Sequence, residues 1–229
     1  MPLTIVFAIY IVIHASLMAF SFRIGSHSWR IWLLRALLFG MLYDNSMLLL
    51  SSIYGVPDWL LSINYPRWVL HAGILPLLTL LVLSFLREAN VAAVKKTWVA
   101  GLFVLITAVC WFYGMWHEVV LLEVGTKSFV DSTATFASME RFSALSTIPP
   151  IATIFTNIFM LPWAFVLWRV TGWKWLFLGA LAIFIINGST SSLPCGFLAG
   201  NLGEIIFMLA LLCTERFFSA AKKRVRSEE

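Results

Sequence analysis

Residues 97–120 read TWVAGLFVLITAVCWFYGMWHEVV, and this stretch decides the class of fold. Between Lys96 and His117 it carries no charged side chain. A helix needs about 20 consecutive, mostly apolar residues to cross a bilayer, so this stretch is long enough to do so. Of the 229 residues in the chain, 61% are hydrophobic and 12% are charged, against roughly 25% charged residues in ordinary soluble domains. The sequence therefore predicts an integral membrane protein without a large soluble domain.

Six further apolar stretches follow the same pattern, so we predict an all-α bundle of seven transmembrane helices that forms one domain over residues 1–229. The connector at about 121–147 is rich in Ser and Thr and is long enough to lie as a lid over one mouth of the bundle. The first span lacks a basic segment before it and an A-x-A cleavage site, which favours a retained helix over a removed signal peptide. The predicted spans are about 2–22, 30–54, 67–86, 97–120, 148–169, 174–190 and 195–215.

Lysine and arginine lie unevenly on the two sides of these spans, and this predicts the orientation of the chain. One side carries thirteen of them, whereas the other carries Arg67, Lys127 and Arg141. Because basic residues concentrate in cytoplasmic loops, we expect the C-terminus in the cytoplasm and the N-terminus outside the cell or in the lumen. The net charge of +5 then reflects orientation in membrane lipid, and we predict no nucleic-acid partner.

Ionisable side chains inside a span are costly unless they face the interior of the bundle, so each one is a candidate for function. A rise of 1.5 Å per residue places Asp44 about 21 Å up the second span and Glu204 roughly 15 Å into the last one. These depths predict one polar pocket that opens away from the cytoplasm, above a packed base of Leu, Ile, Phe and Val. Further polar groups at similar depth are Arg67, His71, His117, Glu118, Asn187 and Asn201.

Structural roles stay open for several of these side chains. Asp44 and Arg67 could form an ion pair that fixes the second span against the third. Glu118 and Glu123 could be solvated at the membrane surface, and His14 could be a core histidine. Glu204 is the strongest functional candidate, because no basic residue lies near it in its own span and burial favours the uncharged acid. Four asparagines could be interhelical hydrogen-bond partners worth about 0.6 kcal/mol each: Asn45, Asn157, Asn187 and Asn201.

Proton transfer is the chemistry that this inventory favours. A protonated acid in an apolar pocket can donate a proton, and a second carboxylate or a histidine can accept one. Aromatic rings such as Tyr43, Trp111 and Tyr113 can stabilise a developing cation. Acid-initiated isomerisation or cyclisation of a lipid-soluble polyene needs all of these groups. The three cysteines form no spaced pair and no DDxxD or NDxxD motif is present, so we expect no metal and no cofactor.

Three segments carry a resemblance to a known family: Tyr43-Asp44-Asn45, Pro66-Arg67 with His71, and Gly200-Asn201-Leu202-Gly203-Glu204. In size, in layout and in these isolated carboxylates, the whole chain resembles the small integral membrane terpene cyclases of fungal meroterpenoid pathways. The ascofuranone and ascochlorin type is the most similar, and the pyripyropene and paxilline type is more distant. The pyripyropene type has a glutamate after tryptophan in the second span and an aspartate in the last, where this chain has Asp44 and Glu204.

The resemblance implies an enzyme of the endoplasmic reticulum membrane. Such cyclases protonate an epoxide of a farnesyl-type substrate, let the cation propagate through the double bonds, and finish by losing a proton. We therefore expect Glu204 or Asp44 to be the acid. In the same scheme Asn45, Asn201 or Arg67 orients the acid or the substrate, and His71 or Glu118 takes the final proton.

Two other classes of protein remain as alternatives. A proton-coupled small-molecule transporter would use the same buried acids, although no inverted repeat is visible. A seven-helix receptor would have the same orientation, although the predicted cytoplasmic loops are short. The predicted last span contains no lysine, which excludes a retinal Schiff base there.

Overall fold

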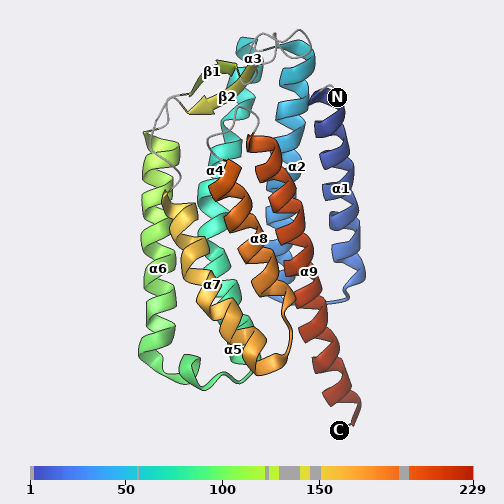
Figure 1. The fold of residues 1–229 in the computed structure, drawn as a ribbon, viewed down its shortest axis with the longest axis vertical. Coiled ribbons are helices and arrows are strands. Elements are labelled where there is room, and N and C mark those ends of the chain that lie inside the picture. The colour runs from blue at the N-terminus through green and yellow to red at the C-terminus, as the bar shows by residue number, and fades with distance from the viewer. Residues whose placement is uncertain are drawn as a thin grey trace.

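The structure is a computed structural model that describes residues 3–55, 57–121, 124–128, 140–144, 151–190 and 196–228. Long helices lie side by side and form a bundle (Figure 1). Within the described part of the chain, six helical segments are long and apolar enough to cross a membrane, and a seventh, α8, is apolar but shorter. This confirms the prediction of an α-helical, multi-pass membrane protein. The helices are α1 (Leu3–Arg23), α2 (Trp29–Tyr54), α6 (Thr97–Met115), α7 (Ile151–Thr171), α8 (Trp175–Thr190) and α9 (Gly196–Glu228).

The third span is assembled from several shorter pieces. It begins at Asp58, earlier than the predicted residue 67, and consists of α3 (Asp58–Asn64), α4 (Pro66–Ile74), the 3-10 turn η1 (Leu75–Leu77) and α5 (Leu78–Glu88). Pro66 and Pro76 lie at the breaks, because proline lacks the N–H that would continue a helical ladder. The last helix, by contrast, runs to Glu228, beyond the predicted end at residue 215.

The two ends of the bundle are different. At one end α6 passes into a π-helical turn, η3 (Trp116–Val120), and two antiparallel strands, β1 (Val124–Ser128) and β2 (Glu140–Ala144), form a hairpin near α3 (Figure 1). We call this the hairpin end. The predicted 121–147 lid falls partly on these strands; its residues 122–123, 129–139 and 145–147, which include Glu123, lie outside the described residues. The opposite end, which contains the connectors 24–28, 89–96 and 172–174, is called the basic end.

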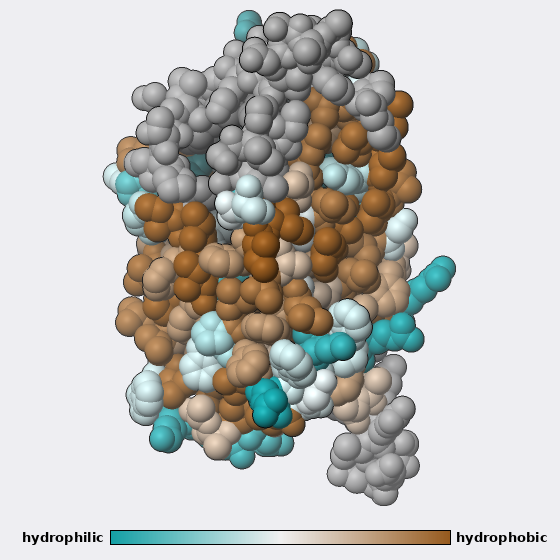
Figure 2. All heavy atoms as spheres, viewed as in Figure 1, coloured by the Kyte–Doolittle hydropathy of each residue, from teal (hydrophilic) through white to brown (hydrophobic). Residues whose placement is uncertain are grey.

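The surface and the core fit a bundle in lipid. Large apolar side chains such as Val12, Phe112 and Trp98 are more than 60% exposed, and Figure 2 shows a hydrophobic surface over the middle of the molecule with hydrophilic residues gathered below it. Inside, α8 and α9 approach closely at Gly179, where an added methyl group would overlap the Cβ of Ala210. Small residues permit such close approach between membrane helices.

Candidate functional site

A cavity of about 400 Å³ lies inside the bundle and is lined by residues from six of the long helical segments just described, all except α1. Its lining changes in polarity along the bundle. Towards the hairpin end the lining residues include Asp44, Arg67, His71, Asn157, Asn201 and Glu204. Towards the basic end they are apolar, as at Leu37, Leu78, Met160, Ile183, Met208 and Leu211. The cavity is therefore amphipathic, and its polar part is at the level that the sequence predicts.

An ion pair between α2 and α4 forms one side of this cavity. Asp44 Oδ1 lies 2.6 Å from Arg67 Nε and 2.5 Å from Arg67 Nη2. Arg67 Nη1 also donates to Asn64 Oδ1 at 2.9 Å, and the residue is 6% exposed. The ion pair between Asp44 and Arg67, which the sequence left open as a structural contact, is therefore present. Both of its residues also line the cavity. Arg67 lies in the first turn of α4, which begins at Pro66.

A second pair joins α4 to the end of α6. His71 Nδ1 lies 3.3 Å from Glu118 Oε2, and Glu118 Oε1 is buried with no hydrogen-bond partner among the described residues. Glu118 belongs to the π-turn η3, a distortion that is frequent at functional sites. His117 and Glu118 of this turn both line the cavity. Tyr65 fixes this turn by donating its hydroxyl hydrogen to the carbonyl of Val119 at 2.5 Å.

The third polar group comes from α9. Glu204 and Asn201 lie one turn apart and both line the cavity. Asn201 Nδ2 donates to Asn45 Oδ1 of α2 at 3.0 Å, and both asparagines are buried. Asn45 does not itself line the cavity; it holds Asn201 from behind. Asn45 and Asn201 therefore form an interhelical hydrogen bond, the structural role that the sequence left open for these asparagines.

The structure brings most of the predicted site residues together, and three of them, Asn45, Tyr43 and Trp111, do not line the cavity. The cavity is lined by Asp44, Arg67, His71, Tyr113, Glu118, Asn201 and Glu204. Tyr43 donates its hydroxyl hydrogen to the carbonyl of Ile63 in α3 instead. Trp111 packs edge-on against Phe112, with 5.1 Å between ring centroids, and does not line the cavity. Neither Tyr43 nor Trp111 is therefore placed to contact a ligand there.

His14 of α1 also stands apart from the cavity. It is fully buried, and its Nδ1 lies 2.9 Å from the carbonyl oxygen of Tyr10 in the same helix. Its Nε2 has no hydrogen-bond partner among the described residues. The placement favours the core histidine considered from the sequence.

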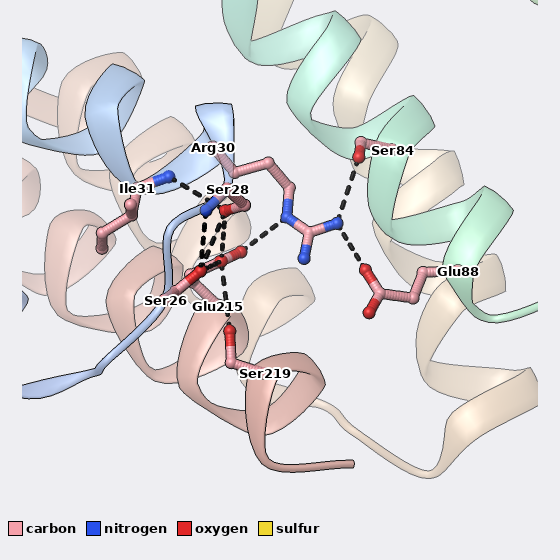
Figure 3. A network of polar contacts seen from close by, with 8 residues as sticks. All are labelled: Ser26, Ser28, Arg30, Ile31, Ser84, Glu88, Glu215 and Ser219. Carbon is pink, nitrogen blue, oxygen red and sulfur yellow. Dashed lines mark hydrogen bonds and ion pairs between the residues drawn. The ribbon is translucent and has the colours of Figure 1, made fainter. Parts of the chain in front are cut away.

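The basic end contains a buried charged network that the sequence analysis missed (Figure 3). Arg30 of α2 donates through Nε to Glu215 Oε2 of α9 at 2.6 Å, and its Nη1 contacts Glu88 and Ser84 of α5. Glu215 is fully buried, and its Oε1 accepts hydrogen bonds from Ser26, Ser28 and Ser219. The base is packed with buried apolar side chains, as expected, but it also contains this charged network, which the sequence did not predict. We call the residues of this charged network the Arg30 network.

Comparison with known proteins adds no family to this description. The chain matches no protein-family model, and no curated protein is similar enough to count as a relative. Among the described residues, no group of three His, Cys, Asp or Glu side chains is placed to hold a metal ion. Function is therefore inferred from the side chains that line the cavity.

Proposed function

We propose that this chain is a membrane-embedded terpene cyclase, an enzyme that protonates an epoxide or alkene of a farnesyl-type substrate and so starts carbocation cyclisation. The observation that carries the proposal is the convergence of Glu204, Asp44, Glu118 and His71 on one amphipathic cavity. Its volume of about 400 Å³ lies within the range of small-molecule sites. A lipid-soluble substrate can enter such a cavity from the bilayer, and no cofactor is needed for proton transfer.

The contacts suggest a role for each carboxyl group. Asp44 accepts hydrogen bonds from Arg67 and so serves as a carboxylate, which leaves Glu204 as the proton donor. The Glu204 O–H bond breaks as its proton moves to the epoxide oxygen. A neighbouring double bond then supplies the electron pair that replaces the breaking C–O bond. Asp44 offers negative charge to the migrating cation.

Termination requires a base that removes a proton from carbon. Glu118 contacts one ring nitrogen of His71, and a carboxylate in this position orients an imidazole for proton transfer. We assign the second ring nitrogen of His71 as the acceptor, with Glu118 as the alternative. Loss of this proton returns the cation to a neutral, cyclised product with the mass of the substrate.

The proposal includes seven membrane crossings, with the N-terminus outside or in the lumen and the C-terminus in the cytoplasm, in the endoplasmic reticulum. It is supported by the basic residues Arg23, Lys95 and Lys174 near the basic end and by the apolar helix α8. The orientation is tested with single cysteines introduced at Gly25 and at Asp58, in a chain whose native cysteines have been replaced. A membrane-impermeant thiol reagent applied to intact microsomes is expected to label position 25 and not position 58. The reverse pattern contradicts this orientation.

The decisive experiment incubates membranes that contain the protein with an epoxyfarnesyl-phenol and follows mass and retention time. We expect a product of unchanged mass and new retention. Glu204→Gln keeps the shape of the side chain but removes the acidic proton, so turnover is expected to fall about 10²- to 10⁴-fold while the protein still accumulates in membranes. Asp58→Asn, an exposed carboxyl group in α3, is the matched control and should retain activity. Full activity in both Glu204→Gln and Asp44→Asn contradicts the mechanism.

A transporter remains the second candidate, because the Arg30 network closes the basic end while the polar part of the cavity lies towards the other end. A transporter must expose its site to each side in turn. Cysteines at positions 44 and 204 would then be labelled from the two sides under different conditions. A cyclase predicts labelling that does not change sides.

A further inference from the structure

Three consecutive residues at the junction of α3 and α4 each form a hydrogen bond with a different element around the cavity. We call Ile63, Asn64 and Tyr65 the α3–α4 corner, and it lies at the hairpin end of the bundle (Figure 1). The helix is interrupted here because Pro66 has no N–H to continue the ladder. The corner does not itself line the cavity, so its contacts act on the side chains that do.

Asn64 supports the Asp44–Arg67 pair from outside the cavity. Its Nδ2 donates to the carbonyl of Leu60 at 2.8 Å, which leaves its Oδ1 for Arg67. Arg67 Nη1 donates to this oxygen at 2.9 Å, while Arg67 Nε and Nη2 contact Asp44. Asn64 is fully buried, and all three guanidinium nitrogens of Arg67 are held. This neutral residue therefore helps to direct Arg67 towards Asp44.

Tyr65 supports the His71–Glu118 pair through the backbone of the π-turn. Its hydroxyl donates to the carbonyl of Val119, the residue after Glu118, at 2.5 Å. Glu118 in turn contacts His71 of α4 at 3.3 Å. His71 lies four residues after Arg67, so the two side chains share one face of α4. Two adjacent residues of the corner thus support both pairs.

Tyr43 connects the corner to α2. Its hydroxyl donates to the carbonyl of Ile63, and the next residue of α2 is Asp44. Tyr43 does not line the cavity, so its contact with the corner takes the place of the substrate contact that the sequence predicts. The corner is therefore connected to α2, α4 and η3, the three elements that carry the two pairs.

We infer that the α3–α4 corner couples the Asp44–Arg67 pair to the His71–Glu118 pair, and that Tyr43, Asn64 and Tyr65 are positioning residues. The inference rests on the proposed function for the reaction that these residues serve. A group that transfers a proton must lie within hydrogen-bond reach of its target, and a misplacement of about 1 Å costs about 10²-fold in rate. A displaced corner disturbs both pairs together.

Amide hydrogen exchange of the purified full chain in detergent tests the coupling without any substrate. Tyr43→Phe removes the hydroxyl that holds Ile63 in α3. We expect exchange to rise about two- to tenfold, the range for one net hydrogen bond, both in α3 and in the π-turn Trp116–Val120. Tyr65→Phe should raise exchange in the π-turn directly. An unchanged π-turn in Tyr43→Phe overturns the coupling.

Tyr54→Phe is the matched control for the loss of a tyrosine hydroxyl. Tyr54 also belongs to α2, but it is 63% exposed and its ring lies against Trp59, with 6.3 Å between ring centroids. This variant should leave exchange in the π-turn unchanged. An equal rise in the control overturns the inference, because the effect would then not pass through the corner.

Steady-state kinetics with the epoxyfarnesyl-phenol tests the positioning role. Because the corner does not line the cavity, Tyr43→Phe and Tyr65→Phe should each lower kcat about two- to tenfold and leave KM unchanged. The double variant should lose less than the product of the two single losses, since residues that act as a unit are not additive. A raised KM with unchanged kcat, or losses that multiply, overturns this role.

These outcomes are separate from those of the proposed function. A rise of π-turn exchange in Tyr43→Phe without conversion of any epoxide keeps the coupling and removes the cyclase. Conversion of an epoxide with unchanged π-turn exchange in Tyr43→Phe keeps the cyclase and removes the coupling.

Discussion

The two charged regions of the bundle are built on different principles. In the Arg30 network both carboxylate oxygens of Glu215 have partners: Oε1 accepts from three serines and Oε2 from Arg30. In the cavity lining, Glu118 and Asn157 each keep one buried side-chain oxygen without a hydrogen-bond partner among the described residues. A satisfied network stabilises one arrangement of helices, whereas an unsatisfied one has bonding capacity left for a ligand. The comparison indicates a structural role for the Arg30 network, and it is consistent with the function that we propose for the cavity.

Removing the arginine from the satisfied network should have the largest effect on stability. Arg30→Met leaves Glu215 buried without its cation, and breaking a buried pair in this way costs about 3–5 kcal/mol. Thermal unfolding in detergent measures the loss. Arg23→Met, an exposed arginine one helix earlier, is the control and should change little. If the charge left behind is the cause, adding Glu215→Leu to Arg30→Met should recover most of the lost stability.

The same substitution in the cavity should be less damaging. Arg67→Met removes the arginine that pairs with the Asp44 carboxylate, but the Asp44 side chain is 27% exposed and faces a cavity that can admit water. We expect a loss of about 1–3 kcal/mol, as for hydrogen bonds to charged groups, together with a fall in turnover. Measuring unfolding and turnover side by side checks this. A loss of stability as large as that of Arg30→Met would remove the distinction between the two regions.

The smallest effect is expected at the neutral hydrogen bond between α2 and α9. Asn201→Leu removes the donor to Asn45, and such bonds between membrane helices contribute about 0.6 kcal/mol. A slight fall in unfolding temperature is the expected result. Asn201 also lines the cavity, so a change in product pattern at nearly unchanged stability would place it with the cavity residues. A loss as large as that of Arg67→Met would place it with the structural ones.

The sequence predicts depth in the bilayer better than it predicts direction around a helix. Counting residues along spans places Asp44, His71 and Glu204 at one level, and they do line one cavity. Tyr43 is next to Asp44 in sequence, yet successive residues lie about 100° apart around a helix. Its hydroxyl therefore reaches Ile63 in α3 rather than the cavity. Direction depends on how the neighbouring helices pack, which the apolar pattern of a membrane helix does not encode.

The Arg30 network escaped prediction for a related reason. Arg30, Glu88 and Glu215 belong to three different helices, each near an end of a predicted span. Charges at such positions are common at the membrane surface, so nothing in the sequence distinguishes a buried triad from three solvated side chains. The early start of the third span was hidden similarly, because Asp58 and Asn64 interrupt the apolar pattern of α3.

Because of the π-turn at Trp116–Val120, we expect the number of residues in this segment to be constrained in evolution. A π-turn accommodates one more residue than an ordinary helical turn, so a single-residue deletion there would restore the α-helix and rotate Glu118 by about 100°. That rotation would carry it away from His71 without altering either side chain. Descendants of this chain should therefore tolerate substitutions in the segment more readily than insertions or deletions.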